Sequence, residues 1–173
     1  LRDNTIRQVK GYGVYPPPLE VPENHINLWK KFPYQDLIAP YKYDIEGVEK
    51  IKELIFILCN RDVECYNYMM LWLSHLLKYP ATKNGKLPIF ISREGAGKGT
   101  LMMIIKALIG EDKYFETSQP ENQVWGRFNS MMANAYFVNL NEIGKKNQME
   151  AEDRIKNILT DAYMIIKGEG DKP

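Results

Sequence analysis

Apolar residues recur at three- and four-residue steps over two neighbouring stretches, the spacing that buries one face of an α-helix. The first stretch covers residues 47–58. The second follows the polar triplet at residues 60–62, which provides helix-capping side chains, and it ends at Pro80, which cannot continue a helix. The pattern therefore predicts a small helical subdomain over residues 44–80.

Shorter apolar runs follow in the second half of the chain. Residues 87–92 (LPIFIS) form an isoleucine-rich run typical of a buried parallel strand. Residues 100–109 (TLMMIIKALI) are apolar almost all round, as in a fully buried helix, and Gly110 closes them. Residues 114–117 and 135–140 are further strand candidates. The alternation of strands and helices predicts an α/β layer with a parallel sheet.

The N-terminal quarter of the chain shows no such periodicity. It is rich in Pro, Tyr and Asn, with consecutive prolines at residues 16–18. We expect this segment to lie over the surface of the rest instead of forming a core of its own. The predicted organisation is an extended segment or linker at 1–43, the helical subdomain at 44–80 and an α/β unit at 86–173.

Composition narrows the class of protein. Of 173 residues, 45% are hydrophobic and 26% are charged, as in ordinary globular proteins. The net charge of +1 excludes a strong basic field, so any contact with DNA would be local. The apolar runs fall short of the ~18 residues that span a bilayer, and no signal peptide opens the chain. We therefore expect an intracellular, cytoplasmic protein with no membrane partner, in which Cys59 and Cys65 are buried, reduced thiols.

The turn between the predicted strand and helix, residues 92–100 (SREGAGKGT), has the chemistry of a phosphate-binding loop. Glycines let successive backbone N–H groups converge on a phosphate, a lysine reaches the β and γ oxygens, and the following helix directs its positive end at the anion. We expect an ATP-binding loop made of seven residues: Gly95, Ala96, Gly97, Lys98, Gly99, Thr100 and Leu101. The alternative is an ordinary glycine-rich turn between a strand and a helix.

Two positions depart from the usual pattern of such loops. Ser92 stands where the first glycine is usual, and Gly99 stands where a magnesium-binding hydroxyl normally follows the lysine. Thr100 is the nearest hydroxyl, and we expect it to contact Mg²⁺.

An acidic residue is expected at the end of a neighbouring buried strand, where ATPases of this architecture hold Mg²⁺ and orient the attacking water. The apolar run 135–140 ends at Asn141 and Glu142. Glu142 is the predicted catalytic base, with Lys98 as the second catalytic residue, and both Asn141 and Glu142 are expected near the metal. Because an amide carries no charge, Asn141 is a weaker ligand than the aspartate that is usual there. The alternative is a solvated glutamate at a strand end.

With both motifs placed, residues 24–173 resemble the superfamily 3 helicases, especially the helicase half of phage, plasmid and viral primase-helicases. The resemblance is carried, in order, by residues 26–32 (INLWKKF), 68–80 (YMMLWLSHLLKYP), 126–144 (GRFNSMMANAYFVNLNEIG) and 156–172. It implies a P-loop NTPase core of the AAA+ type behind a helical collar. It also implies an ATP-hydrolysing DNA helicase that assembles as a ring, usually a hexamer, around single-stranded DNA and binds ATP at subunit interfaces.

The resemblance further implies an upstream primase domain in the same polypeptide, and a third motif and an interface arginine after the second acidic motif. The chain begins at Leu1 without an initiator methionine. We therefore expect a P-loop core that is truncated after the second acidic motif, belongs to a longer enzyme and hydrolyses ATP weakly or not at all by itself.

A turn signal at residues 168–171 (GEGD), flanked by Lys167 and Lys172, predicts a hairpin tip with positive charge. In the resembling family a hairpin at this place projects into the ring channel, which implies that both lysines contact DNA phosphates. A solvated loop with ordinary lysines is the alternative.

Two other functions are compatible with the loop. GAGKGT is also typical of nucleoside monophosphate kinases, but their loop lies near the N-terminus and arginines clamp two nucleotides, whereas only Arg127 and Arg154 follow the loop here. A non-hydrolysing ATP-binding module for oligomerisation or origin binding would explain Gly99 and Asn141.

Overall fold

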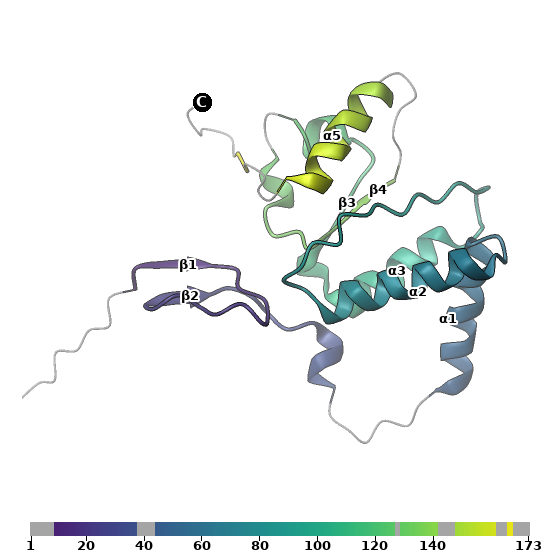
Figure 1. Ribbon diagram of the computed structural model, residues 1–173, viewed down its shortest axis with the longest axis horizontal. Helices are drawn as coiled ribbons and strands as arrows, with labels where there is room; N and C mark the ends of the chain where they lie inside the picture. The colour runs from purple at the N-terminus through teal and green to yellow at the C-terminus, as the bar shows by residue number, and fades with distance from the viewer. Residues whose placement is uncertain (1–8, 38–43, 127–128, 142–147, 162–165, 168–173) are drawn as a thin grey trace, which may run out of the picture.

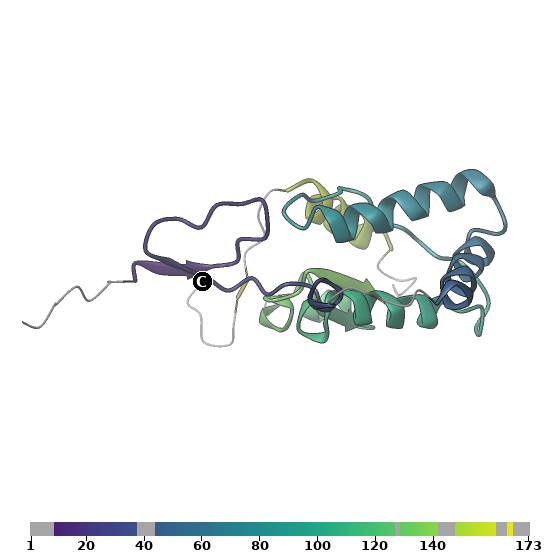
Figure 2. The ribbon, with the colours of Figure 1, turned by 90° about the horizontal axis from the view of Figure 1, so that it is seen from below.

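The computed structural model describes residues 9–37, 44–126, 129–141, 148–161 and 166–167. The elements in chain order are β1 (Gly11–Gly13), β2 (His25–Asn27), η1 (Pro33–Asp36), α1 (Ile45–Leu58), α2 (Val63–Lys78), α3 (Lys98–Ile109), η2 (Glu111–Lys113), β3 (Tyr114–Thr117), α4 (Pro120–Gln123), η3 (Ser130–Met132), β4 (Phe137–Leu140) and α5 (Gln148–Thr160). In Figures 1 and 2 the β1–β2 pair lies at one end of the molecule and α1 at the other, with α2 and α3 between them.

Helices α1 and α2 confirm the helices that the apolar periodicity predicts within residues 44–80. Each begins after an aspartate whose carboxylate accepts a hydrogen bond from a backbone N–H in the first turn. Asp44 accepts from Gly47 at 3.0 Å, and Asp62 accepts from Cys65 at 2.7 Å. Such caps replace the helical partners that the first N–H groups lack.

The carbonyl end of α2 is closed by two phenol groups from distant parts of the chain. The hydroxyl of Tyr34 donates to Leu77 O at 2.9 Å, and that of Tyr136 donates to Leu76 O at 2.5 Å. The last carbonyls of a helix have no helical donor. These bonds therefore satisfy them and tie α2 to both η1 and the start of β4.

One core joins all three predicted parts of the chain. Its buried members come from the N-terminal segment, from α1 and its C-terminal cap, from α2 and from α3: Phe32, Ile55, Cys59, Met69, Leu101, Ile105 and Ile109. The helical subdomain thus packs directly against α3. No helix within the described ranges combines the length and the apolar character needed to cross a bilayer.

Strands β3 and β4 pair in parallel, with Tyr114 opposite Phe137 and Glu116 opposite Asn139. This confirms the strand predicted at residues 114–117 and places the second one at Phe137–Leu140, two residues later than its predicted start. The short strands β1 and β2 form a separate parallel pair.

The run at residues 87–92 differs from its prediction. It forms no strand, and the side chains of Ile89 and Ile91 are 74% and 94% exposed. An apolar run indicates a tendency to be buried, but a strand also needs a hydrogen-bonding neighbour, and among the described residues none pairs with it. The prediction of a buried parallel strand is therefore wrong for this part of the chain.

Helix α3 was predicted to be fully buried because it is apolar almost all round, but it buries only one face. Leu101, Ile105 and Ile109 are buried at four-residue steps, whereas Met103 is 71% exposed. The helix ends at Gly110, whose N–H donates to Lys106 O at 2.9 Å and whose φ of 97° suits glycine.

The N-terminal segment enters the core instead of only covering it. Phe32 is 0% exposed, and its ring lies 5.3 Å from those of both Trp29 and Tyr136. Beside it, Lys113 is 6% exposed and places its ammonium 5.5 Å from the Trp29 ring centroid. Asp112 binds this ammonium at 3.3 Å.

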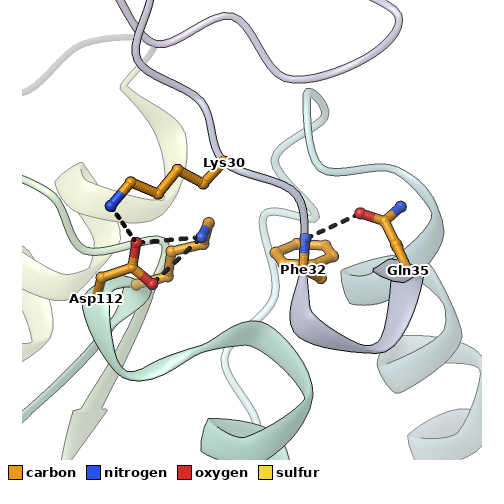
Figure 3. Close-up of polar contacts among 5 residues, drawn as sticks. Lys30, Phe32, Gln35 and Asp112 are labelled. Atoms are coloured by element: carbon orange, nitrogen blue, oxygen red, sulfur yellow. Dashed lines mark hydrogen bonds and ion pairs between the residues drawn. The ribbon is translucent and has the colours of Figure 1, made fainter. Parts of the chain in front are cut away.

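Figure 3 shows how the chain is held on either side of Phe32. Lys30 extends toward Asp112, at 3.8 Å, and the side-chain oxygen of Gln35 accepts from Phe32 N at 2.9 Å. The N-terminal segment is therefore held by the buried ring of Phe32, by the ion pair of Lys30 with Asp112 and by the hydrogen bond from Phe32 N to Gln35.

Replacing Phe32 with Ala should lower the free energy of unfolding by about 3–5 kcal/mol, because a fully buried ring is lost and the cavity closes only in part. Urea or thermal unfolding would measure the change. Tyr12→Ala, at an exposed position of β1, is the control and should shift stability by less than about 0.5 kcal/mol. Equal effects of the two variants would contradict the anchoring role of Phe32.

Candidate functional site

The predicted phosphate-binding loop leads directly into α3, whose first residue is Lys98. Gly95 and Gly97 have φ angles of +75° and +97°, a conformation that glycine adopts at little cost. At Gly97 a Cβ would also lie 2.5 Å from the Leu54 side chain of α1, whereas at Gly95 it would meet nothing within 4 Å. The loop is thus pressed against α1 at one glycine and open at the other, with the partly buried Ala96 between them.

The ammonium of Lys98 folds back over this loop. It donates to Ser92 O at 3.0 Å, to Ser92 Oγ at 2.7 Å and to Arg93 O at 3.2 Å. All three donors of the ammonium are therefore used by the beginning of the loop. Ser92, which departs from the usual glycine, supplies two of the three acceptors, a role that the sequence pattern did not suggest.

The N-terminus of α3 faces the same loop. The first helical hydrogen bond runs from Leu101 N to Gly97 O at 3.1 Å, so the N–H groups of the three preceding residues have no helical acceptor. Such N–H groups, with the positive end of the helix dipole, attract anions. Leu101, predicted as part of the nucleotide-binding loop, is buried in the core, and its N–H donates to Gly97 O.

Gly99 and Thr100 are both exposed in the first turn of α3. A Cβ added at Gly99 would meet no atom within 4 Å. The packing of the described residues therefore does not require glycine at this position, and the missing hydroxyl is not explained by lack of space.

A second polar group lies at the carboxyl ends of β3 and β4. The N–H of Asn141 donates to Thr117 O at 2.9 Å and so continues the parallel ladder. Its side-chain N–H donates to Glu116 Oε1, and its side-chain oxygen accepts from Asn139 at 2.9 Å. Tyr114 donates its hydroxyl proton to Glu116 Oε2 at 2.7 Å. Four polar side chains thus form a connected set that runs from Tyr114 at the start of β3 to Asn141 at the strand end.

The charge of this group resides on Glu116. The hydrogen bond from Tyr114 holds the pKa of Glu116 below its usual value, and partial burial opposes this effect only in part. Smaller contributions in the same direction come from Asn141, Asn139 and Lys106. Burial, followed by the bond to Glu116, raises the pKa of Tyr114. At neutral pH the carboxylate is therefore ionised and the phenol keeps its proton.

The two groups line one cleft, of about 1240 Å³, although they are far apart in sequence. Lys98 and Gly99 contribute from α3, and Glu116, Asn139 and Asn141 contribute from the strand ends. A cleft of this volume exceeds the ~300–1000 Å³ typical of small-molecule sites. Sequence reasoning missed Glu116 and Asn139; the available signal was that the ends of parallel strands meet at one edge of a sheet.

The residues present fit a nucleoside triphosphate with Mg²⁺. The loop offers backbone N–H groups, one ammonium and open space at Gly95, and Thr100 in the first turn of α3 and Asn141 after β4 carry oxygen atoms of the kind that Mg²⁺ prefers. Among the described residues no group of three or more His, Cys, Asp or Glu side chains could hold a metal by itself. Phosphate and water oxygens would therefore complete the shell of the ion.

Three predicted site residues fall at or beyond the edges of the described chain. Glu142 and Lys172 lie outside the described residues. Lys167 is described, and its backbone is held by Asn129, whose side-chain oxygen accepts from Lys167 N at 2.8 Å and whose N–H donates to Lys167 O at 3.2 Å.

Comparison with known proteins gives related but partial matches. A model described as "Family of unknown function (DUF5906)" matches residues 90–173. Over 151 residues the chain is 27% identical to "DNA Primase-polymerase" of Nitratiruptor phage NrS-1, an alignment that covers 86% of this chain and 20% of that protein. The chain thus spans about a fifth of the length of this relative.

Two solved structures of the NrS-1 C-terminal region have a similar fold. The apo structure of region 305–718 matches with a TM-score of 0.71 and 24% identity, covering 92% of this chain and 38% of that one. An A form of the apo structure gives 0.70 and 25%, with 94% and 38% covered. The chain is therefore similar in sequence to part of a phage DNA primase-polymerase and shares the fold of part of its C-terminal region.

Proposed function

We propose that this chain is the nucleotide-binding part of an ATP-driven DNA helicase of the superfamily 3 kind that acts in phage DNA replication. The observation that carries the proposal is the cleft lined by Lys98 and Gly99, at the start of α3, and by the polar strand end. The similarity to a phage DNA primase-polymerase supports the replication role. It also agrees with the expected primase domain upstream in the same polypeptide.

Phosphate binding would follow from groups that are already in place. The N–H groups at the start of α3 have no helical acceptor, the Lys98 ammonium lies over the beginning of the loop, and Gly95 has open space beside it. Lys98 would exchange its bonds to Ser92 and Arg93 for phosphate oxygens, so its charge need not move far. Charge-assisted bonds to phosphate are stronger than those to neutral carbonyls, which favours the exchange.

Hydrolysis would need groups at the strand end. Asn141 and Thr100 would face the metal side of the phosphates, and Glu142, the next residue along the chain, would accept a proton from the attacking water. Magnesium, when bound, neutralises charge on the phosphates.

The wider assembly follows from the family resemblance. We propose a ring, usually of six subunits, that binds ATP between subunits and moves along single-stranded DNA inside the host cell. Lys167 and Lys172 would contact DNA phosphates without reading sequence. The pairing of Lys167 with Asn129 would hold the base of this DNA-contacting segment on the nucleotide-binding unit.

Two observations favour a second candidate, an ATP-binding module that does not hydrolyse. Gly99 offers no hydroxyl, and the side chain of Asn141 already bonds to Glu116 and Asn139. Such a chain would bind ATP to stabilise an assembly without turning it over.

Lys98→Ala should weaken ATP binding about 10- to 100-fold, because charge-assisted bonds of ~1.5–3 kcal/mol to phosphate are lost. Titration with a fluorescent ATP analogue would measure it. Lys78→Ala is the matched control, since it removes the same charge at the exposed end of α2. Unchanged affinity in Lys98→Ala would sink the proposed site.

Glu142→Gln should leave ATP binding close to that of the unmodified protein and reduce hydrolysis about 10²- to 10⁴-fold, because the general base is lost. Phosphate release with and without single-stranded DNA would report it, and Glu111→Gln is the control. Tight binding with no hydrolysis by the unmodified protein, even with DNA present, would favour the non-hydrolysing module.

A further inference from the structure

The pairing register of β3 and β4 places five side chains on one face of the sheet. Glu116 lies opposite Asn139, and side chains two residues apart on a strand share a face. Tyr114 and Phe137 therefore lie on the face of Glu116, and their rings stack at 5.6 Å with an interplanar angle of 10°. Asn141 continues this face to the carboxyl end of the sheet. The face changes from aromatic to polar toward the carboxyl ends of the strands.

Hydrogen-bond chemistry fixes the orientation of the Asn141 amide. An ionised carboxylate only accepts, so Asn141 must present its NH₂ group to Glu116. Its oxygen then points away from Glu116 and accepts from Asn139 at 2.9 Å. Asn139 also donates to the Tyr114 hydroxyl at 3.1 Å, while Tyr114 donates to Glu116. The Asn141 oxygen has two lone pairs, and the hydrogen bond from Asn139 uses one of them. The other lone pair can accept a further bond.

We propose that Glu116 is a positioning residue that supplies, through Asn141, the negative charge missing at position 141, where an aspartate is usual. The proposal rests on the proposed function. A carboxylate that accepts a hydrogen bond from an amide NH₂ polarises the amide, so that negative charge increases on the amide oxygen, as bonds in a chain polarise one another. The Asn141 oxygen is then both oriented and more negative, so it becomes a better acceptor for the hydrated cation of Mg²⁺-ATP.

The charges around Glu116 agree with this role. The positive charge of Lys106, on α3, helps to lower the pKa of Glu116. Lys106 also forms an ion pair with Glu111 at 2.9 Å. Glu111 thus neutralises part of the Lys106 charge from outside the cleft. The negative charge of Glu116 is therefore only partly offset by Lys106. Removing either carboxylate takes one negative charge from the surroundings of Lys106, but only Glu116 touches Asn141.

The test compares ATP-analogue affinity of the purified protein in Mg²⁺ and in EDTA. Glu116→Gln keeps the shape and a neutral hydrogen bond to Asn141 but removes the charge. We expect the gain in affinity caused by Mg²⁺ to fall about 10-fold, as for other residues that orient a metal ligand. Affinity in EDTA should stay within about 2-fold of the unmodified protein, since no phosphate contact is lost. Glu111→Gln, the matched control, should change neither value.

A double variant separates charge from structure. Asn141→Asp in the Glu116→Gln background moves the carboxylate to the strand end and should restore the Mg²⁺-dependent gain. Asn141→Asp alone places two carboxylates in contact, which repel, so it should not exceed the double variant. Rescue in the double variant supports loss of charge as the defect of Glu116→Gln, and failure of rescue would overturn the inference, because an aspartate at position 141 supplies that charge directly.

The outcomes distinguish this inference from the proposed function. If the unmodified protein binds no ATP analogue, both are overturned. If it binds with a Mg²⁺-dependent gain that Glu116→Gln leaves unchanged, the role of Glu116 alone is overturned. Equal losses of affinity in Mg²⁺ and in EDTA, with a lowered melting temperature, would assign Glu116 to the fold and likewise overturn the inference.

Discussion

The burial of one face of α3 is the constraint on which the arrangement of the cleft depends. Leu101, Ile105 and Ile109 lie at four-residue steps and are almost completely buried, so α3 cannot rotate without exposing them. At an estimated 25 cal/mol per Å² of apolar surface, three such side chains contribute several kcal/mol. This packing fixes the direction of the helix, and with it the position of Lys98 at the end of the glycine loop. The close approach of Gly97 to Leu54 sets the loop against α1.

Helix α3 and the strand ends contribute opposite charges to the lining of the cleft. Lys98 and Lys106 place positive charge along α3, and Glu116 is the ionised group of the polar set on the β3–β4 edge. Tyr114 joins the two sides, because its ring lies 6.0 Å from the Lys106 ammonium and its hydroxyl bonds to Glu116. The cleft is therefore polar at Lys98 and at the strand end, and more apolar along α2, where Trp72 packs against Phe137.

The parts of the fold that sequence predicted are those set by local chemistry. The aspartate caps and the three-to-four spacing located α1 and α2, and short apolar runs located β3 and β4. The run at 87–92 was misassigned because a strand depends on a neighbour that local pattern does not reveal. Phe32 was missed for a similar reason, since its core partners lie far along the chain. Glu116 became visible only once the register of β3 and β4 was known.

The two tyrosines that close the carbonyl end of α2 give the fold an alkaline limit. Burial raises the pKa of Tyr136 to about 12 and also raises the pKa of Tyr34. Below about pH 10 both phenols are protonated whether the chain is folded or unfolded, so they add no pH dependence. Above that value the unfolded chain releases these protons first, and stability falls as the pH rises toward the folded-state values. In strong base the joint between the helices and the sheet is thus an early place for the molecule to open.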